Sequence, residues 1–236
     1  MVRLGNHELP VAIAPTHPND GNRIGLFGGT FNPIHCGHLR AAEEVRECFN
    51  LEKVIFIPAR VPPHKHNEPI VTPEHRLTMV RLAIRNNPAF DVSSLEIKRD
   101  APSYSILTIE HFREKCGPEA ALFFLMGMDS FLEISTWREC ARLFSLADFI
   151  VMTRPGYTKK EISQILTVDV AKKFYYNSRE GCYIHSSRHR LYFQEITLLE
   201  ISSRAIRARI KDQGSLRYLV LPVVERYIKK HNLYAT

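Results

Sequence analysis

The sequence predicts an α/β fold: a doubly wound, Rossmann-like parallel sheet with helices on both faces and a C-terminal helical portion. Two observations predict it. Short apolar runs typical of buried strands alternate with segments whose apolar residues recur at helical spacing. The helical segments are also long enough to form the crossover connections that parallel neighbouring strands require. Because a doubly wound sheet binds ligands beyond the carboxyl ends of its strands, a site is expected in the residues that follow the strands.

The expected elements follow one another in a regular order. The predicted strands cover residues 24–27, 53–60, 90–98, 121–127 and 148–153, with a return to the pattern at 192–200. The predicted helices cover residues 39–51, 74–87, 105–116, 130–144, 201–210 and a C-terminal stretch from about Leu221 and Pro222. Thr72 followed by Pro73 is typical of an N-cap and a first helical residue, so the second helix is expected to begin there.

The length of 236 residues suits one domain. Residues 1–22 are expected to form a flexible leader, and residues 23–236 are expected to form a single domain. The segment 156–195 interrupts the alternation of strands and helices because it is rich in Lys, Tyr, Ser and Arg. It is expected to be a polar insertion, and an RNA-contact surface is the alternative interpretation.

Composition and cysteine usage exclude several classes of protein. No apolar run approaches the roughly 18 residues of a membrane span, and the first twenty residues carry charges where a secretory segment is apolar. The chain is therefore expected to be cytoplasmic, with no membrane partner. Its five cysteines are odd in number and never form a C-x-x-C pair, which favours reduced thiols over disulfides or a thiolate metal site. The net charge of +7 suits a polyanionic partner without identifying it.

The stretch GGTFNPIHCGH, residues 28–38, directly follows the first predicted strand. Gly28 and Gly29 remove side chains at the strand end, so backbone N–H groups can approach an anion closely. Pro33 stiffens the loop, and the following helix aims the positive end of its dipole at the same place. His35 and His38, three residues apart at the helix entrance, can present two imidazoles to one anion. The stretch therefore predicts a phosphate-binding loop.

Other interpretations of this stretch are weaker. The two histidines could also recruit a metal ion, but no third His, Cys or carboxylate lies nearby at ligand spacing. The chain lacks G-x-x-x-x-G-K-[ST], and this turn lacks G-x-G-x-x-G, so neither a P-loop nor a dinucleotide fingerprint is present. Cys36 lies inside the stretch, where a space-filling role and a reactive thiol both stay open.

GGTFNPIHCGH resembles the signature of the nucleotidylyltransferase superfamily, whose H-x-G-H element binds and activates a nucleoside triphosphate. Within the superfamily the chain is most similar to the bacterial nicotinate-mononucleotide adenylyltransferases, from about residue 23 to the C-terminus. The other matching motifs, in chain order, are PARVPPHK (58–65), EHR (74–76), SYSILTI (103–109), MGMD (126–129), Trp137, TRPG (153–156) and ISSRAIR (201–207). Three positions depart from the family pattern while keeping a hydrogen-bonding residue: Asn32 replaces Asp, Ser105 replaces Thr, and Arg204 replaces Thr.

The resemblance implies transfer of AMP from ATP to nicotinate mononucleotide, which gives deamido-NAD and pyrophosphate in NAD biosynthesis. The implied catalytic residues are His35, His38 and Arg207, and Arg207 would clamp phosphate oxygens with its planar fork of donors. The implied ATP-binding residues are Gly28, Gly29, Thr30, Phe31, His35, His38, Ser202, Ser203 and Arg207. Ser202 and Ser203 would also cap the helix that begins there. Mg²⁺ is expected to be bound mainly through the ATP phosphates, so no protein metal ligand is assigned.

The resemblance also implies a site for the second substrate. Its residues would be Lys65, Tyr104, Ser105, Asp129, Trp137 and Arg154. Lys65 and Arg154 would face phosphate, Asp129 the ribose, Trp137 the pyridine ring and the Tyr104–Ser105 pair the carboxylate.

Each of these roles has a structural alternative. Trp137 could be a core residue, Asp129 could cap a helix, and Lys65 could belong to a solvated loop. A phosphopantetheine adenylyltransferase or a cytidylyltransferase is the alternative within the superfamily. A non-enzymatic, basic RNA-binding protein is the alternative from another class, although no RNP-type strand or C-x-x-C finger is present. No nucleic-acid partner is expected, and a homo-oligomer stays open.

Overall fold

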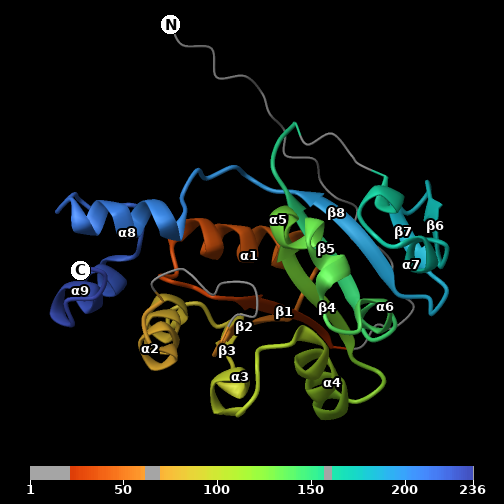
Figure 1. Cartoon of the computed structure of the whole chain (residues 1–236), viewed down its shortest axis with the longest axis horizontal. Coiled ribbons are helices and arrows are strands. Elements are labelled where there is room, and N and C mark those ends of the chain that lie inside the picture. The colour runs from red at the N-terminus through yellow and green to blue at the C-terminus, as the bar shows by residue number, and fades with distance from the viewer. Residues whose placement is uncertain (1–21, 62–69, 157–160, 236) are drawn as a thin grey trace, which may run out of the picture.

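The computed structural model describes residues 22–61, 70–156 and 161–235, which form an eight-stranded sheet covered by helices (Figure 1). The strand order is β3-β2-β1-β4-β5-β8-β7-β6. The first six strands in this order are parallel, and β7 runs antiparallel to both neighbours. The strands are β1 (Arg23–Gly29), β2 (Lys53–Pro58), β3 (Phe90–Val92), β4 (Ala121–Gly127), β5 (Asp148–Thr153), β6 (Phe174–Asn177), β7 (Cys182–His185) and β8 (Arg190–Glu195). The predicted doubly wound sheet is confirmed, while the predicted leader lies, except for Asn22, outside the described residues.

Five longer helices connect or follow the strands: α1 (Cys36–Cys48), α2 (Pro73–Ile84), α4 (Ser105–Cys116), α8 (Ser203–Lys211) and α9 (Pro222–Lys230). Single turns lie between them: α3 (Leu95–Lys98), α5 (Met128–Leu132), η1 (Ile134–Thr136), α6 (Cys140–Leu143), η2 (Ile162–Gln164) and α7 (Val168–Ala171). Thr72 and Pro73 begin α2 as predicted, with proline in the first turn. None of the helices in the described part of the chain is long and apolar enough to cross a membrane.

The sheet separates two layers of hydrophobic core. Because successive strand side chains point to opposite faces, Phe123 packs in the layer that holds α1 and α2, while Phe124 packs in the layer that holds α4 and α5. Strand β4 is buried at six of its seven positions and β5 at all six. This burial on both faces explains why both strands are continuous apolar runs rather than alternating patterns.

Three predicted elements are wrong in part. The strand pattern expected to return at 192–200 forms β8, which begins at Arg190 and ends at Glu195. The strand expected at 90–98 ends at Val92, and Leu95–Lys98 form the turn α3. Ser93 Oγ accepts a hydrogen bond from the backbone N–H of Leu95 (3.2 Å), a local contact that favours a turn over a continued strand. The single helix expected at 130–144 is broken into α5, η1 and α6. The chain is extended at Trp137 (ψ 143°), and Glu139, directly before α6, lies in the left-handed region at φ 53°.

The segment 156–195 contributes directly to the sheet. Its described residues form η2, α7 and strands β6, β7 and β8. Strand β8 pairs in parallel with β5, and β7 and β6 extend the sheet as an antiparallel edge beyond it. The boundaries of a polar insertion stay a prediction, but the segment carries sheet structure that its composition did not indicate.

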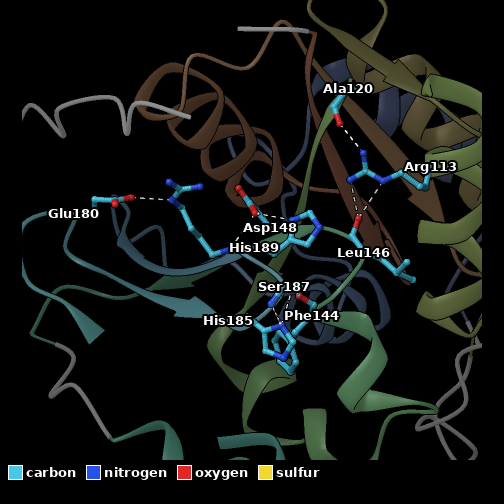
Figure 2. A network of polar contacts seen from close by, with 10 residues as sticks. Arg113, Ala120, Phe144, Leu146, Asp148, Glu180, His185, Ser187 and His189 are labelled. Carbon is cyan, nitrogen blue, oxygen red and sulfur yellow. Dashed lines mark hydrogen bonds and ion pairs between the residues drawn. The ribbon is translucent and has the colours of Figure 1, made fainter. Parts of the chain in front are cut away.

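A polar network closes the amino ends of β4 and β5 (Figure 2). Asp148, only 1% exposed, accepts a hydrogen bond from the backbone N–H of Arg190 (3.0 Å) and lies 3.1 Å from Nδ1 of His189. Arg113 of α4 donates through Nε (3.2 Å) and Nη2 (2.7 Å) to the carbonyl of Leu146. We refer to Arg113, Asp148, His189 and Arg190 as the amino-edge network. It joins α4, β5 and β8, so it fixes the end of the sheet opposite to the carboxyl ends of the strands.

Candidate active site

Two cavities meet where the direction of strand order reverses, beyond the carboxyl ends of β1 and β4. Gly28, Gly29 and Gly127 line both of them. One cavity, of about 280 Å³, extends toward the first turn of α4 and is named the α4-side cavity. The other, of about 300 Å³, extends toward the first turn of α1 and is named the α1-side cavity. Ligands of doubly wound sheets bind at such a switch point, so the two cavities form the candidate site.

Gly29, at the end of β1, is packed closely by the loop that follows it. A Cβ atom added to Gly29 would lie 2.9 Å from Cζ of Phe31, nearer than carbon atoms approach without displacement. Phe31 is 3% exposed and lines the α1-side cavity, while Thr30 lines the α4-side cavity. Consecutive residues of the loop therefore face different cavities. Position 29 requires glycine because the ring of Phe31 occupies the space that a side chain at this position would need.

His35 and His38 form a stacked pair beside the α1-side cavity. Their ring centroids are 3.6 Å apart with an interplanar angle of 22°. The backbone N–H of each residue donates to Nδ1 of the other at 3.3 Å, a reciprocal capping box at the start of α1. Since Nδ1 accepts in both rings, the neutral imidazoles carry their proton on Nε2.

Burial sets the charge of this pair. His35 is 6% exposed, and desolvation lowers its pKa from 6.5 to about 4. At neutral pH His35 is therefore an uncharged hydrogen-bond donor through Nε2. His38 is half-buried, and both rings line the same cavity. The pair can offer two N–H donors to one anion without carrying a full charge on His35.

Helix α8 is fastened to the loop between β1 and α1. Ser203 Oγ donates to the carbonyl of Pro33 (2.8 Å), and Arg207 Nη1 donates to the carbonyl of Asn32 (2.9 Å). Ser202 caps α8 as predicted by accepting from the backbone N–H of Ala205 (3.1 Å). The structure thus brings the ISSRAIR motif against the GGTFNPIHCGH stretch, although the two lie about 170 residues apart.

Three predicted residues of the second-substrate site come together in the α4-side cavity: Tyr104, Ser105 and Trp137. Tyr104 is the N-cap of α4 and makes no side-chain capping hydrogen bond, so the first backbone N–H groups of α4 are not capped from that side chain. Trp137 is half-buried and packs edge-to-face on Phe124 at 6.2 Å between ring centroids. Its indole therefore packs against the hydrophobic core and also forms part of the cavity wall.

The other predicted residues lie elsewhere. Arg154 follows β5, is exposed and lines the α1-side cavity rather than the cavity of Trp137. Asp129 is exposed in the first turn of α5 and lines neither cavity, and it does not cap that helix, because the N-cap is Gly127 and no side chain makes a capping hydrogen bond there. Lys65 lies outside the described residues. Within the described parts of the chain, no group of three or more His, Cys, Asp or Glu side chains is placed to hold a metal ion.

Sequence reasoning missed three charged residues of the α4-side cavity, namely Glu96, Glu133 and Arg138. Glu96 is 7% exposed, accepts a hydrogen bond from Thr108 Oγ1 (2.7 Å), and has its pKa raised by burial. Arg138 lines the cavity with its guanidinium 5.1 Å from the ring centroid of Tyr104. Its position directly after Trp137 was a signal that could have found it, whereas Glu96 reaches the cavity only through the turn α3, which the sequence did not predict.

The fold and the two cavities place this chain in the class of doubly wound proteins with a candidate ligand site at the switch point of the sheet, where paired imidazoles at a helix start line one cavity. A family model described as cytidylyltransferase-like matches residues 26–209. A protein of Geotalea daltonii, named probable nicotinate-nucleotide adenylyltransferase, is 45% identical over 212 residues, which cover 90% of this chain and 98% of the relative. A protein of Geobacter sulfurreducens with the same name is 43% identical over 213 residues, which cover 90% of this chain and 98% of that relative.

A solved structure agrees with this assignment at the level of the fold. The nicotinic acid mononucleotide adenylyltransferase of Plasmodium falciparum, complexed with NaAD, matches with a TM-score of 0.66 at 20% identity, over 91% of this chain and 98% of that one. The chain belongs to the cytidylyltransferase-like family and, within it, to the nicotinate-nucleotide adenylyltransferases, and it is a nucleotidyltransferase.

Proposed function

We propose that this chain transfers AMP from ATP to nicotinate mononucleotide, giving deamido-NAD and pyrophosphate. The observation that carries the proposal is the pair of cavities that meet at Gly28, Gly29 and Gly127. A reaction between two nucleotides needs two adjoining sites, with the reacting phosphates at their junction. One cavity contains the stacked imidazoles, which suit a triphosphate, and the other contains Trp137, which suits a flat ring.

ATP would occupy the α1-side cavity. The Nε2–H groups of His35 and His38 would donate to its phosphates, and the start of α1 would add its dipole and backbone N–H groups. Arg207 would neutralise phosphate charge from the first turns of α8, where one of its nitrogens already holds the loop through Asn32. Arg154, which lines the α1-side cavity, would complete the polar surroundings of the triphosphate, whereas Ser202 and Ser203 do not line that cavity and would support the site from the start of α8.

Charge neutralisation and alignment would do most of the catalytic work. The nucleophile is an oxygen of the mononucleotide phosphate, which is already ionised near neutral pH, so the reaction needs no protein group to remove a proton. Two anions must instead be brought together in line, and hydrogen-bond donors aimed at the α- and β-phosphates stabilise the charge that develops there. ATP would be bound as its Mg²⁺ complex, in which the metal would supply screening of the phosphate charge, and no residue of this chain is assigned as its ligand.

The mononucleotide would occupy the α4-side cavity, with its pyridine ring against Trp137. The backbone N–H of Ser105, in the first turn of α4, would receive the carboxylate of the ring, since a helix start favours a negative group, whereas the N–H of Tyr104 already donates to the carbonyl of Pro102 (2.8 Å). Arg138, stacked beside Tyr104, adds a cation on the same wall. Lys65 and Asp129 stay candidates for the phosphate and the ribose. This arrangement favours nicotinate over its amide, which carries no charge.

The test is incubation of the purified chain with Mg-ATP and nicotinate mononucleotide, followed by separate measurement of pyrophosphate and deamido-NAD. Both products should appear in equal amounts and should disappear together when either substrate is left out. Phosphopantetheine and nicotinamide mononucleotide serve as competing acceptors in parallel reactions. A folded protein that releases neither product, or that prefers phosphopantetheine, would contradict the proposal.

A further inference from the structure

The end of the chain folds back onto the phosphate-binding loop. After α9, Asn232 and Tyr234 adopt left-handed backbone conformations, with φ of 49° and 67°. Such conformations are costly for residues other than glycine and persist where surrounding contacts hold them. Tyr234 is only 8% exposed, although it lies two residues from the C-terminus. The chain end is therefore held in a specific place rather than left in solvent.

The contact that Tyr234 makes there is a hydrogen bond to the loop itself. Its hydroxyl lies 2.9 Å from Oδ1 of Asn32 and donates to it. Asn32 is 3% exposed, and the same Oδ1 accepts from the backbone N–H of Val71 (3.3 Å). Burial raises the pKa of the Tyr234 hydroxyl, so it keeps its proton and is a donor at neutral pH.

The neighbouring positions of the loop are held from other elements. Arg76 of α2 is fully buried and donates through Nη1 to the carbonyl of Thr30 (2.8 Å). Arg207 and Ser203 of α8 hold the carbonyls of Asn32 and Pro33, as described above. Tyr234 differs from these residues because it bonds to the side chain of Asn32, whereas the others bond to backbone carbonyls of the loop. Asn32 precedes His35 by three residues, so a shift of Asn32 is passed through a short, stiff segment to the stacked imidazoles.

We propose that the Tyr234 hydroxyl is a positioning group for the reaction: by fixing Asn32 it sets where the His35–His38 pair stands relative to the triphosphate. The inference rests on the proposed function and extends the site to the last turn of the chain. Tyr234 does not line either cavity, so it acts through Asn32 rather than by contact with a substrate. Its loss should lower turnover more than it lowers the affinity for the mononucleotide, which is bound in the other cavity.

The experiment compares Tyr234→Phe with Tyr227→Phe. The hydroxyl of Tyr227 in α9 lies 2.9 Å from Nδ1 of His75, so the control removes a hydroxyl that also connects the C-terminal region to the rest of the chain. Steady-state kinetics with Mg-ATP and nicotinate mononucleotide and a thermal melt are recorded for each protein.

For Tyr234→Phe we expect kcat to fall about five- to tenfold, with KM for the mononucleotide changed less than about twofold. Tyr227→Phe should keep the wild-type kcat at a similar change in Tm. Equal kcat values in the two variants would overturn the inference.

A double-mutant cycle separates positioning from general loosening. In an Asn32→Ala background the hydroxyl has no acceptor left, so adding Tyr234→Phe should change kcat by less than about twofold. A full five- to tenfold loss in that background would overturn the inference, because the hydroxyl would then act through another group.

Histidine side-chain NMR without substrate gives a readout that does not depend on turnover. Tyr234→Phe should shift the imidazole signals of His35 and His38, whereas Tyr227→Phe should shift those of His75 and its neighbour His231. Unmoved His35 and His38 signals would overturn the inference even if the variant were slow. A wild-type protein that turns over neither substrate would instead contradict the proposed function, while the NMR comparison would still decide whether Tyr234 positions the histidines.

Discussion

The two ends of the parallel sheet use similar residues in different ways. At the amino ends, the buried carboxylate of Asp148 contacts His189 and Arg190, and Arg113 donates to backbone carbonyls. At the carboxyl ends, His35 and His38 line a cavity of about 300 Å³. Buried polar groups that satisfy one another stabilise a fold, whereas polar groups directed at a hollow are available to a ligand. Arg113, Asp148 and His189 also line a hollow of about 300 Å³, but the hydrogen bonds described above connect them to one another and to backbone groups. The partners of the polar groups, rather than the presence of a hollow, therefore distinguish the structural network from the candidate site.

Two buried histidines make the same point. His35 is 6% exposed and His185 is 4% exposed, and burial lowers the pKa of both. Each also accepts a backbone N–H through Nδ1, from His38 and Ser187 respectively. However, His185 packs against Phe174 at 4.8 Å between ring centroids and lines neither of the two site cavities, while His35 lines one of them with a second imidazole. Burial and a lowered pKa therefore do not by themselves make a histidine a candidate for the site; His35 is a candidate because it lines the cavity at the switch point of the sheet beside a second imidazole.

Among substitutions at the two ends of the sheet, His38→Ala is expected to have the largest effect on turnover. Turnover should fall by more than tenfold, toward about a hundredfold, because the substitution removes a donor aimed at charge that develops between the α- and β-phosphates. The matched change at the other end of the sheet is His189→Ala. It should lower the free energy of unfolding by about 1–3 kcal/mol, since Asp148 loses a partner, and leave kcat unchanged. The two variants are compared by steady-state kinetics and urea unfolding; a His38→Ala enzyme with normal turnover would assign His38 to the fold.

The next effect concerns the α4-side cavity. Trp137→Ala should weaken binding of nicotinate mononucleotide by about 1–3 kcal/mol, by analogy with the stacking of bases on aromatic side chains. Affinity for ATP should change little, because the triphosphate is bound in the other cavity. The measurement is one saturation curve for each substrate with the wild type and the variant. Since Trp137 also packs on Phe124, a melt must show that the variant is folded, and equal weakening of both substrates would contradict this placement of the ring.

The pH dependence of stability tests the burial of His35 directly. Its folded-state pKa of about 4 lies below 6.5, so between these values the unfolded chain binds the proton more readily than the folded chain. The contribution of His35 to stability is therefore fully present above about pH 6.5 and is lost as the pH falls toward 4. At pH 5 the loss amounts to about 2 kcal/mol relative to pH 8. Urea unfolding at both pH values should show this difference between the wild type and His35→Gln; an identical pH dependence would mean that His35 is not desolvated.

The sequence predicted those parts of the fold whose signals are local. Residues 105–116, 121–127 and 148–153 were expected with the bounds that α4, β4 and β5 have in the structure. In each case a helical period or a continuous apolar run decides the element within a dozen residues. The break at Glu139 was missed because a left-handed residue other than glycine has no composition signal.

The site was predictable to a similar extent. The GGTFNPIHCGH stretch predicts a phosphate-binding loop because its glycines, proline and histidines lie within eleven consecutive residues. The residues of the ISSRAIR motif were predicted as part of the same site only through the resemblance to the family. Contacts over long separations had no such signal. The hydrogen bond from Tyr234 to Asn32 spans 202 residues, and Arg76 reaches Thr30 across 46. These contacts depend on which helices cover which end of the sheet, so only the assembled fold reveals them.

The smallest expected effect, and the sharpest test of what makes the α4-side cavity a site for an acid, is that of Arg138→Gln. The side chain of Arg138 is 53% exposed and lies 3.5 Å from Glu139, so its charge is screened by solvent and partly offset. Removing that charge should lower the ratio of kcat/KM for nicotinate mononucleotide to that for its amide by about threefold, since an exposed ion pair contributes about 0.2–1 kcal/mol.

Arg142→Gln is the matched control, because Arg142 is also 53% exposed and contacts Glu139 at 3.0 Å but lines neither cavity. The ratio should fall only for Arg138→Gln, and the fall should shrink as salt is added. If both variants lower the ratio equally, the general positive charge of the surface selects the acid; if neither does, selection belongs to the backbone N–H groups at the start of α4 alone.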